Sequence, residues 1–355
     1  MLCQPHFQAT GNERILTPNL RESSSGEFLN APMNDSATSF EDNRQRLRFL
    51  LEQLSTEQGL CPTILDGVTI ARANSALPRH QVLYEPSIYI VASGRKTGFV
   101  EDRRFVYDQN HYLVQTVPLP FEVMTELEEG GPMLGISVHL GMSIVAELAS
   151  KMGLSPQSTE PDKYAAVQPS PMDNRMCQAA IRLVASLHST RDAAILGPDI
   201  IREIIYCVLS GAHRDALLSA FNKSSAIAKM QVVLETIHRA YSQPLDTARS
   251  AEALGISIST FHQLFKEVTG TSPVLYLRAV RLHKARLFIR YDGLGATATA
   301  AKIGYANPSQ FSRDFKSFFG YAPTREAVRD DDLIGTDGDE TAFLHKSAEG
   351  SMKPI

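Results

Sequence analysis

Two segments near the carboxyl end carry hydrogen-bonding side chains at helical spacing. The first set comprises Ser257, Ser259, Thr260, His262, Gln263 and Lys266, and the second comprises Asn307, Ser309, Gln310, Ser312, Arg313 and Lys316. Residues three and four apart share one face of a helix, so each set is expected to form a polar helical face. Hydroxyl, amide and guanidinium groups hydrogen-bond both base edges and phosphates. Both segments are therefore predicted to contact double-stranded DNA.

The individual side chains suggest different partners on DNA. Arg313 is the best candidate for a forked pair of hydrogen bonds to guanine, and Gln263 or Gln310 can pair with adenine. Lys266 and Lys316 are expected to meet phosphates. His262 faces a base, a phosphate or water. The alternative for both sets is a polar face that is merely solvated, so the elements that carry these residues must decide.

The charge distribution agrees with a nucleic-acid partner. Residues 223–329 contain 15 Lys and Arg against 7 Asp and Glu, a net charge of +8, and the rest of the chain then carries −12 of the total of −4. Basic side chains release counterions from phosphates, so a basic block on an acidic chain suits a polyanion. A basic surface is often only solvated, and charge alone does not settle the point.

Apolar residues predict the helices that position the first polar set. An opening helix carries Ile227, Met230, Leu234, Ile237 and Tyr241 and ends at Gln243-Pro244. A helix over 246–254 stops at Gly255, which tolerates left-handed backbone, and Ser257 can cap the next helix. That helix buries Phe261, Leu264, Phe265 and Val268. A short helix, a glycine turn and a helix with a polar outer face form a helix-turn-helix unit.

The same arrangement recurs further along the chain. Residues 299–305 lead into Asn307-Pro308, a cap followed by a proline suited to the first helical position. The buried stripe is Phe311, Phe315, Phe318 and Phe319. Phe265-Lys266, Gly270 and Pro273 recur as Phe315-Lys316, Gly320 and Pro323, displaced by 50 residues. Between the units, a helix from Ser272-Pro273 to Phe288 is expected to hold the recognition helices at a fixed separation, and reading two successive major-groove faces requires roughly 34 Å, one turn of B-DNA.

These residues resemble the AraC family of transcription regulators over about 100 positions. The resemblance lies in Thr269-Gly270-Thr271-Ser272-Pro273, Tyr276-Leu277, Arg281-Leu282, Gly304-Tyr305, Pro308-Ser309-Gln310-Phe311-Ser312-Arg313, Phe315-Lys316 and Phe319-Gly320-Tyr321-Ala322-Pro323. A weaker resemblance to the N-terminal domain of one AraC-type subgroup lies in 82–87, Gly94-Arg95-Lys96, 111–114, 118–120 and Arg202-Glu203-Ile204 with Tyr206. Two positions depart from the family. Gln263 stands where many relatives have arginine, and Thr299 stands where a large aliphatic residue is usual.

The resemblance implies both a fold and partners. The fold is α+β, with an N-terminal cupin-like antiparallel β-barrel or sandwich bearing a helical appendage, then an all-α domain whose two helix-turn-helix units are joined by a long helix. The implied partners are operator or promoter DNA, RNA polymerase, a small-molecule effector and a second copy of the chain. It implies no cofactor, no metal and no catalytic residue. The family includes activators, and the residues themselves do not distinguish activation from repression.

Composition and patterning divide the chain into five parts. Residues 1–40 are polar and aperiodic and form a predicted flexible arm. Residues 41–211 form the effector-sensing and dimerisation domain, 212–225 a linker, 226–329 the DNA-binding domain, and 330–355 an acidic tail. No apolar run approaches the ~20 residues of a membrane span and no signal-peptide pattern opens the chain, so a cytoplasmic protein without a membrane partner is expected.

The 41–211 region combines a helix, strands and further helices. A helix is predicted over 41–54, and β-rich runs lie at 88–92, 105–107, 112–117 and 134–138, separated by turn residues, as in an antiparallel sandwich or barrel. Two apolar helical stripes follow. They are Met176, Ala180, Leu183, Val184 and Leu187, and then Ile201, Ile204, Ile205, Val208 and Leu209. Each is either internal core or a dimer seam. Pro198 is expected in the first turn of the second helix.

An enzyme is the rival function. Cupin-like barrels can hold a metal, but His80, His111 and His139 form no H-x-H pair and are expected to be packed or surface residues. Cys3, Cys61, Cys177 and Cys207 form no C-x-x-C pair and are expected to be small buried residues or bystanders. No nucleophile elbow, phosphate loop or dinucleotide fingerprint is present.

The strand region contains four cations that an anionic ligand could meet. They are Arg95, Lys96, Arg103 and Arg104. Exposed hairpin charges are the favoured interpretation, because lysine and arginine in short strands usually face water. The effector therefore stays unidentified from the sequence.

Overall fold

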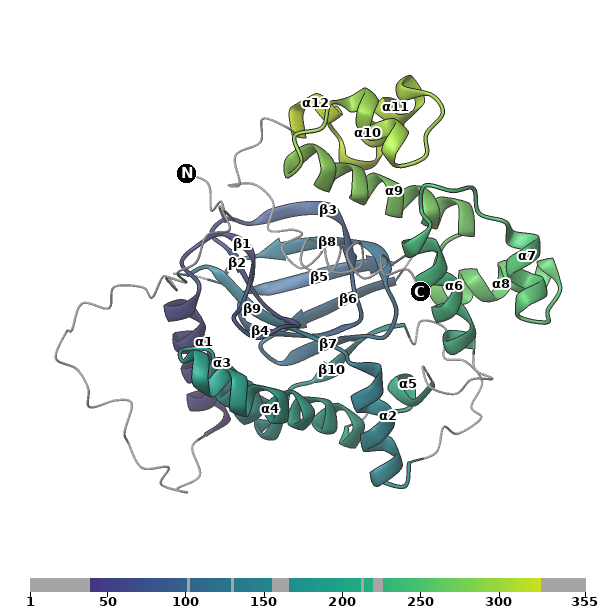
Figure 1. Cartoon of the computed structure of the whole chain (residues 1–355). Coiled ribbons are helices and arrows are strands. Elements are labelled where there is room, and N and C mark those ends of the chain that lie inside the picture. Colours follow the sequence, from purple (N-terminus) through teal and green to yellow (C-terminus); the bar gives the residue numbers. More distant parts are fainter. Residues whose placement is uncertain are drawn as a thin grey trace, which may run out of the picture. The chain divides into compact units, whose positions relative to one another are not determined.

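The computed structural model describes residues 39–100, 103–128, 131–154, 166–211, 214–219 and 226–326. Most of the predicted arm and the whole predicted tail lie outside these residues. A ten-stranded sheet occupies the first half of the described chain, and helices follow it (Figure 1). The α+β fold with a curled antiparallel sheet is confirmed.

Every strand pairing in the sheet is antiparallel. The strands are β1 (Gly59–Pro62), β2 (Val68–Ala73), β3 (Leu77–Tyr84), β4 (Ser87–Ser93), β5 (Arg95–Val100), β6 (Arg103–Asp108), β7 (His111–Gln115), β8 (Leu119–Glu126), β9 (Met133–His139) and β10 (Val167–Pro171). Their order is β1-β2-β9-β4-β7-β6-β5-β8-β3, with β10 paired to β7. The four predicted β-rich runs correspond to β4, β6, β7 and β9.

Alternation along the strands gives the sheet two apolar faces. On β4, Ile88 and Ile90 point into a cluster shared with the helices. Tyr89 and Val91 point into the interior of the curled sheet, together with residues of β6 and β8 such as Phe105. Both faces are buried, so the sheet has an inner and an outer core.

Helices α1 (Phe40–Leu54), α2 (Met142–Lys151), α3 (Asn174–Ser186) and α4 (Thr190–Ser210) cover the outer core. Ser39 caps α1 in a capping box with Asp42, as its sequence favours. Both predicted apolar stripes are used inside the chain. Leu183 of α3 and Ile204 of α4 are fully buried in the cluster that includes Leu47 of α1. The structure therefore confirms the interpretation of both stripes as internal core.

The prediction for Pro198 was wrong. Helix α4 begins at Thr190, so Pro198 lies inside it rather than in its first turn. The start signal is Ser189, whose side chain accepts a hydrogen bond from the Asp192 amide at 3.2 Å. Because Ala193 is buried and Gly197 packs closely on Leu65, the turns before the proline are held by the core and the helix continues past it.

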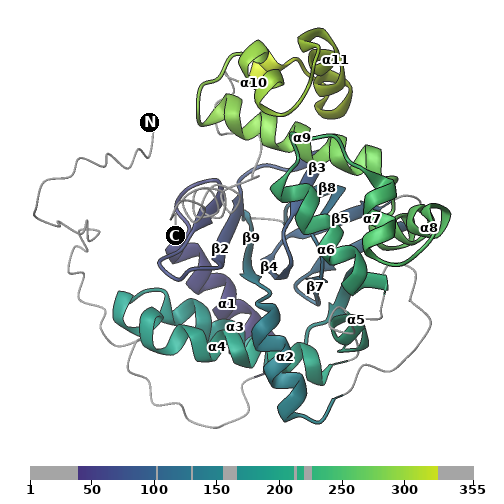
Figure 2. The same cartoon turned by 45° about the vertical axis from the view of Figure 1, so that its right-hand side comes forward.

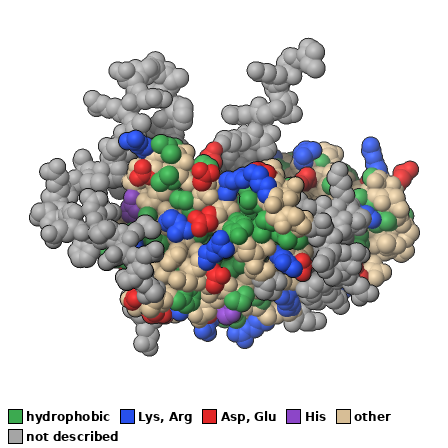
Figure 3. Space-filling view, turned by 90° about the horizontal axis from the view of Figure 1, so that it is seen from below, with side chains coloured by type: hydrophobic (Ala, Val, Ile, Leu, Met, Phe, Trp, Pro, Cys, Tyr) green, Lys and Arg blue, Asp and Glu red, His purple; other side chains and the backbone are tan. Residues whose placement is uncertain are grey.

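Ion pairs link the outer helices to one another. Arg202 of α4 contacts Glu147 of α2 at 2.8 and 3.0 Å, and Lys151 contacts the same carboxylate at 2.8 Å. Hydrogen bonds from Arg202 and Lys151 lower the pKa of Glu147 to about 2. Seen from below, this side of the molecule intersperses basic, acidic and hydrophobic side chains (Figure 3). Interspersed charges of this kind are typical of a solvated surface.

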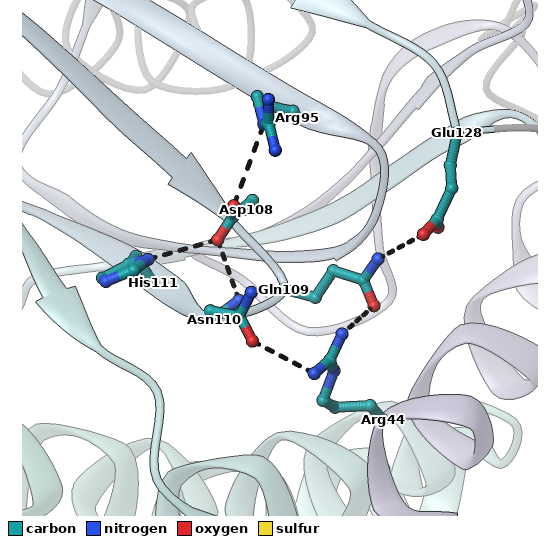
Figure 4. Close-up of polar contacts among 7 residues, drawn as sticks. All are labelled: Arg44, Arg95, Asp108, Gln109, Asn110, His111 and Glu128. Atoms are coloured by element: carbon teal, nitrogen blue, oxygen red, sulfur yellow. Dashed lines mark hydrogen bonds and ion pairs between the residues drawn. The ribbon is translucent and has the colours of Figure 1, made fainter. Parts of the chain in front are cut away.

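The turn between β6 and β7 is fastened to α1 by a polar network (Figure 4). Arg44 donates to the side-chain oxygens of Asn110 at 3.0 Å and of Gln109 at 2.6 Å. Asp108 accepts from the backbone of Asn110 at 2.9 Å and pairs with Arg95 at 3.9 Å. The network thus joins the β6–β7 turn to α1, and its Arg95–Asp108 pair also links β5 to β6.

The remaining helices are α5 (Arg214–Ser219), α6 (Ala226–Arg239), α7 (Thr247–Ala253), α8 (Ile258–Thr269), α9 (Pro273–Arg290), α10 (Ala296–Lys302), α11 (Pro308–Phe319) and α12 (Pro323–Glu326). The segment expected to be a linker thus includes a short helix, α5, whose Leu217 and Leu218 are buried in the outer core. Helix α9 contacts β3 and β8 and lies beside β3 in both ribbon views (Figures 1 and 2).

Candidate nucleic-acid interface

The first helix-turn-helix unit forms as the residues predict. Asp246 begins α7 by accepting a hydrogen bond from the Arg249 amide at 2.9 Å, and Ser257 begins α8 by accepting from Thr260 at 3.1 Å. Phe261 and Phe265 of α8 are fully buried. Their burial against α6 and α9 directs the opposite face of α8 outward.

The second unit repeats this construction. Asn307 begins α11, with its side-chain oxygen accepting from the amides of Ser309 at 2.8 Å and Gln310 at 3.3 Å. Phe311 and Phe315 are fully buried, and Gly320 ends the helix in the left-handed conformation, as Gly270 does for α8. The predicted internal repeat is therefore also a structural repeat.

Gly304 in the turn before α11 has a steric reason to be glycine. Its φ is 82°, and a Cβ there would lie 2.0 Å from the carbonyl oxygen of Ser242. Ser242 follows α6, so the second unit's turn sits directly on the chain that leaves the first helix of the domain. Any larger residue would push these two segments apart.

Helix α9 joins the two units and also holds the turn that follows α6. Arg281 donates to the carbonyls of Tyr241 at 2.7 Å, Ser242 at 3.3 Å and Gln243 at 3.0 Å. These carbonyls belong to the turn that follows α6, so Arg281 fastens this turn to α9. With 18 residues, α9 is about 27 Å long at 1.5 Å per residue.

The predicted contact residues lie on the two outer faces. All twelve are exposed except Ser312, which is half-buried. Arg313 donates to the side-chain oxygen of Gln310 at 2.8 Å, and the amide of Gln310 donates to Asp314 at 2.8 Å. Gln263 donates to Glu267 at 2.9 Å. The side-chain oxygens of Ser257 and Asn307 accept hydrogen bonds from backbone amides at the starts of α8 and α11, so both residues position these helices whether or not they also contact DNA.

Some supporting residues were not singled out by the sequence analysis. Asp314 accepts from the Tyr305 hydroxyl at 3.1 Å and pairs with Arg278 of α9 at 3.5 Å, so it ties α11 to its supports. Burial raises the pKa of Tyr305 well above its usual range. Ile258 at the start of α8 is 50% exposed, an apolar side chain beside the polar face. A signal for Asp314 existed in its spacing of four from Gln310.

The departure at Thr299 is accommodated by the fold. Thr299 is fully buried, and its hydroxyl donates to the carbonyl of Leu294 at 3.4 Å. A buried hydroxyl with a partner carries little penalty, so the smaller side chain does not leave an unsatisfied polar atom in the second unit.

The helical domain and the sheet share a buried contact. Tyr276 of α9 is fully buried and donates its hydroxyl hydrogen to the carbonyl of Pro118 at 2.8 Å. His238 Nε2 lies 2.8 Å from the same hydroxyl. Because that hydroxyl has one hydrogen and gives it to Pro118, Nε2 of His238 must be the donor in the second bond. Burial lowers the pKa of His238 to about 3, so its ring is neutral at pH 7.

Two family profiles match this architecture in order. Residues 64–216 match the family described as AraC-type transcriptional regulator N-terminus, and residues 250–327 match a helix-turn-helix domain. The chain belongs to the AraC family of transcriptional regulators. The two matches cover the curled sheet with its helices and most of both helix-turn-helix units.

Relatives of this AraC-family chain are distant. The HTH-type transcriptional activator RhaS of Escherichia coli is 25% identical over 152 residues, which is 43% of this chain and 54% of RhaS. The chain thus spans about half the length of the curated relatives it matches. An apo ToxT variant from Vibrio cholerae covers 77% of this chain and 99% of its own, with 11% identity and a TM-score of 0.52. ToxT described as bound to unsaturated fatty acid covers 74% and 94%, with 9% identity and the same TM-score.

Other kinds of site were sought in the described part of this AraC-family chain. Within it, no three His, Cys, Asp or Glu side chains gather as a metal would require. His111 is exposed, whereas His80 and His139 are half-buried. Cys177 and Cys207 are buried and Cys61 is half-buried, as expected, while Cys3 lies outside the described residues. None of the helices in these ranges is long and apolar enough to span a bilayer.

Proposed function

We propose that this chain is a sequence-specific DNA-binding transcription regulator whose helices α8 and α11 enter adjacent major grooves of an operator. The observation that carries the proposal is the pair of capped helices with exposed polar faces, held by the buried strut α9. Helix α9, about 27 Å long, lies between the two units along the chain, and successive major-groove faces on one side of B-DNA lie roughly 34 Å apart. An enzyme is not proposed, because the family consists of transcription regulators.

The contacts on DNA follow from side-chain chemistry. Arg313 is the proposed reader of guanine in the second unit, and Gln310 or Gln263 the proposed reader of adenine. Lys266 and Lys316 are proposed to neutralise phosphates. Ile258 adds an apolar group at the start of α8 that can meet the methyl group of thymine.

The further partners are proposed from the family. RNA polymerase is the expected partner if the chain activates transcription, as the name of RhaS states for that protein. A small-molecule effector is proposed in the N-terminal domain, and the ToxT structure with fatty acid supports the idea that this fold accepts a ligand. A homodimer is also proposed. Because the α3 and α4 stripes are filled by the chain's own core, the dimer must use other residues.

Selection from a pool of random duplexes tests the DNA proposal. The full chain should enrich a site with two sequence blocks whose centres lie about 10.5 base pairs apart, because the proposal places α8 and α11 on one face of the DNA double helix. A single block, or blocks half a turn apart, would contradict the proposed docking. Failure to enrich any sequence would refute sequence-specific binding. Light scattering of the full chain at micromolar concentration tests the dimer.

A further inference from the structure

Lys96 is buried, contrary to the expectation of an exposed hairpin charge. Lys96 on β5 is 3% exposed, whereas the side chain of its neighbour Arg95 is 55% exposed. The strand register explains the difference. Arg95 pairs with Asp108 on the outer side (Figure 4), and Lys96 pairs with Tyr107 of β6 and Thr125 of β8 on the inner side.

The Lys96 ammonium has no counter-charge among the residues that the structure describes. Its Nζ donates to the hydroxyl of Tyr84 at 3.3 Å and lies 5.0 Å from the centre of the Tyr89 ring. No carboxylate of the described residues comes within 4.0 Å of it. Burial lowers the pKa of Lys96 to about 8, so the group remains mostly charged at pH 7. A buried charge of this kind is costly unless an opposite charge approaches it.

Two hydroxyls around Lys96 are also buried without a partner. The side chains of Tyr89 and Thr125 are 4% and 1% exposed, and neither hydroxyl oxygen has a hydrogen bond. Buried hydroxyls are normally bonded to something, and these two can both donate. A cation with two free donors is a set of groups suited to a carboxylate, which accepts several hydrogen bonds through two oxygens.

The rest of the interior is apolar and aromatic. The rings of Tyr89 and Tyr107 meet edge to face at 5.7 Å, and Phe105 and Phe121 lie 5.7 Å apart. Gly98 permits this packing, because a Cβ there would lie 2.3 Å from the Phe105 ring. An anion without an apolar body would gain little from these walls.

We infer that the interior of the curled sheet binds a small organic carboxylate with an apolar or aromatic body, its carboxylate paired with Lys96 and accepting hydrogen bonds from Tyr89 and Thr125. This inference deepens the proposed function by naming the chemical class of the effector. It rests on the proposed function only for the role of the ligand as effector, because the binding site is defined by the sheet alone.

The site lies beside the contact between the sheet and the DNA-binding helices. Tyr84, which accepts the Lys96 hydrogen bond, is the last residue of β3. The next residue, Glu85, has a carboxylate oxygen 3.8 Å from Nδ1 of His238 in α6. A ligand that draws Lys96 from Tyr84 therefore acts one residue away from a contact with the helical domain. Operator affinity is expected to change when the carboxylate binds.

The test uses the full chain and a panel of short carboxylates. Calorimetry and thermal unfolding would compare benzoate, phenylacetate, hexanoate and octanoate with their neutral amides. Carboxylates should bind and raise Tm, whereas the amides should bind at least tenfold more weakly. Lys96→Met keeps the unbranched apolar part of the side chain and removes its charged end, so binding should be lost. Arg95→Met, on the same strand but the outer face, is the matched control and should bind as the wild type does.

The outcomes test the carboxylate site separately from the proposed DNA-binding function. Loss of binding in Lys96→Met with retention in Arg95→Met supports the site, and a smaller loss in Tyr89→Phe supports the hydrogen bond. Equal binding by Lys96→Met and the wild type, or no carboxylate binding by the wild type at millimolar concentration, would overturn it. Operator binding measured without ligand tests the proposed function separately. If the wild type binds both operator and carboxylate but its operator affinity does not change, the effector role is wrong.

Discussion

Arg313→Ala is the substitution that best separates base reading from general attraction to DNA. The side chain is exposed on α11, and its one described hydrogen bond is to the neutral side chain of Gln310. Its loss should change the free energy of unfolding by no more than about 0.5 kcal/mol, as for other surface positions. Any larger effect on DNA binding therefore reflects the interface.

The size of the effect depends on what Arg313 contacts. A forked pair of hydrogen bonds to guanine is worth about 1–3 kcal/mol, which corresponds to a loss of roughly 5- to 150-fold in operator affinity. That loss should fall on one base pair, so preference at that position should relax. Lys316 is exposed one turn nearer the end of α11. If it meets a phosphate, Lys316→Ala should weaken all duplexes alike and reduce the salt slope by about 0.9.

Binding curves at several salt concentrations, on selected operator and on scrambled duplex, measure both quantities. Arg191 on α4 is exposed and provides a control that removes the same charge far from α11. Arg191→Ala should leave both curves unchanged. If Arg313→Ala weakens operator and scrambled duplex equally, Arg313 does not read a base. If neither α11 variant changes binding, the second unit is not a DNA-reading element.

Three further substitutions or conditions test the supporting structure. Tyr276→Phe removes the hydroxyl that bonds both Pro118 and His238. In urea titrations it should lower the free energy of unfolding by about 1–3 kcal/mol. Unchanged stability would mean that the contact does not form in solution. Acid should destabilise the protein through His238. The pKa of this group is about 3 when folded and about 6.5 when unfolded, so only the unfolded state gains the proton as pH falls through this window. Stability should then drop by up to about 1.4 kcal/mol per pH unit, and His238→Gln should flatten that slope; equal slopes would contradict the burial argument. Gly304→Ala should lower the free energy of unfolding by well over 2 kcal/mol, because its Cβ would lie 2.0 Å from a backbone oxygen. Gly293→Ala, also at positive φ but with open space around it, should lower it by only about 1–2 kcal/mol. Similar losses of stability in both variants would show that the close approach at Gly304 is absent.

The helical domain was predictable because its signals are local. A cap such as Ser257 or Asn307, a glycine at a fixed offset and an apolar stripe each specify a boundary within a few residues. The repeat at 50 residues then confirmed each signal with a second copy. Even the burial of Phe261 and Phe311 follows from spacing alone, since one face of each helix must be covered.

The sheet was only partly predictable, because strand pairing is not local. The sequence identified four β-rich runs but not how they pair. Strand β4 pairs with β7, from which β5 and β6 separate it in the chain, and with β9, which comes later still. Lys96 shows the consequence. Arg95 and Lys96 look alike in sequence, and only the register decides which of them enters the core. The prediction for Pro198 in α4 was wrong for a related reason, because tertiary packing maintains a helix that local propensity alone would end.

The two helix-turn-helix units contact the sheet in different ways, the first through a shared apolar cluster and the second through α11 against β3. The apolar cluster of the first unit contains Leu83 and Val117, both from the sheet region, beside Phe265 and Tyr276 of the helical domain. The cluster of the second unit draws only on residues after 240, such as Phe315. A change in the sheet near Tyr84 therefore reaches the support of α8 through this shared apolar cluster, whereas it reaches α11 through the contact of that helix with β3. A ligand in the sheet would thus act on α8 through the shared apolar cluster and on α11 through β3, so both recognition helices are linked to the proposed site.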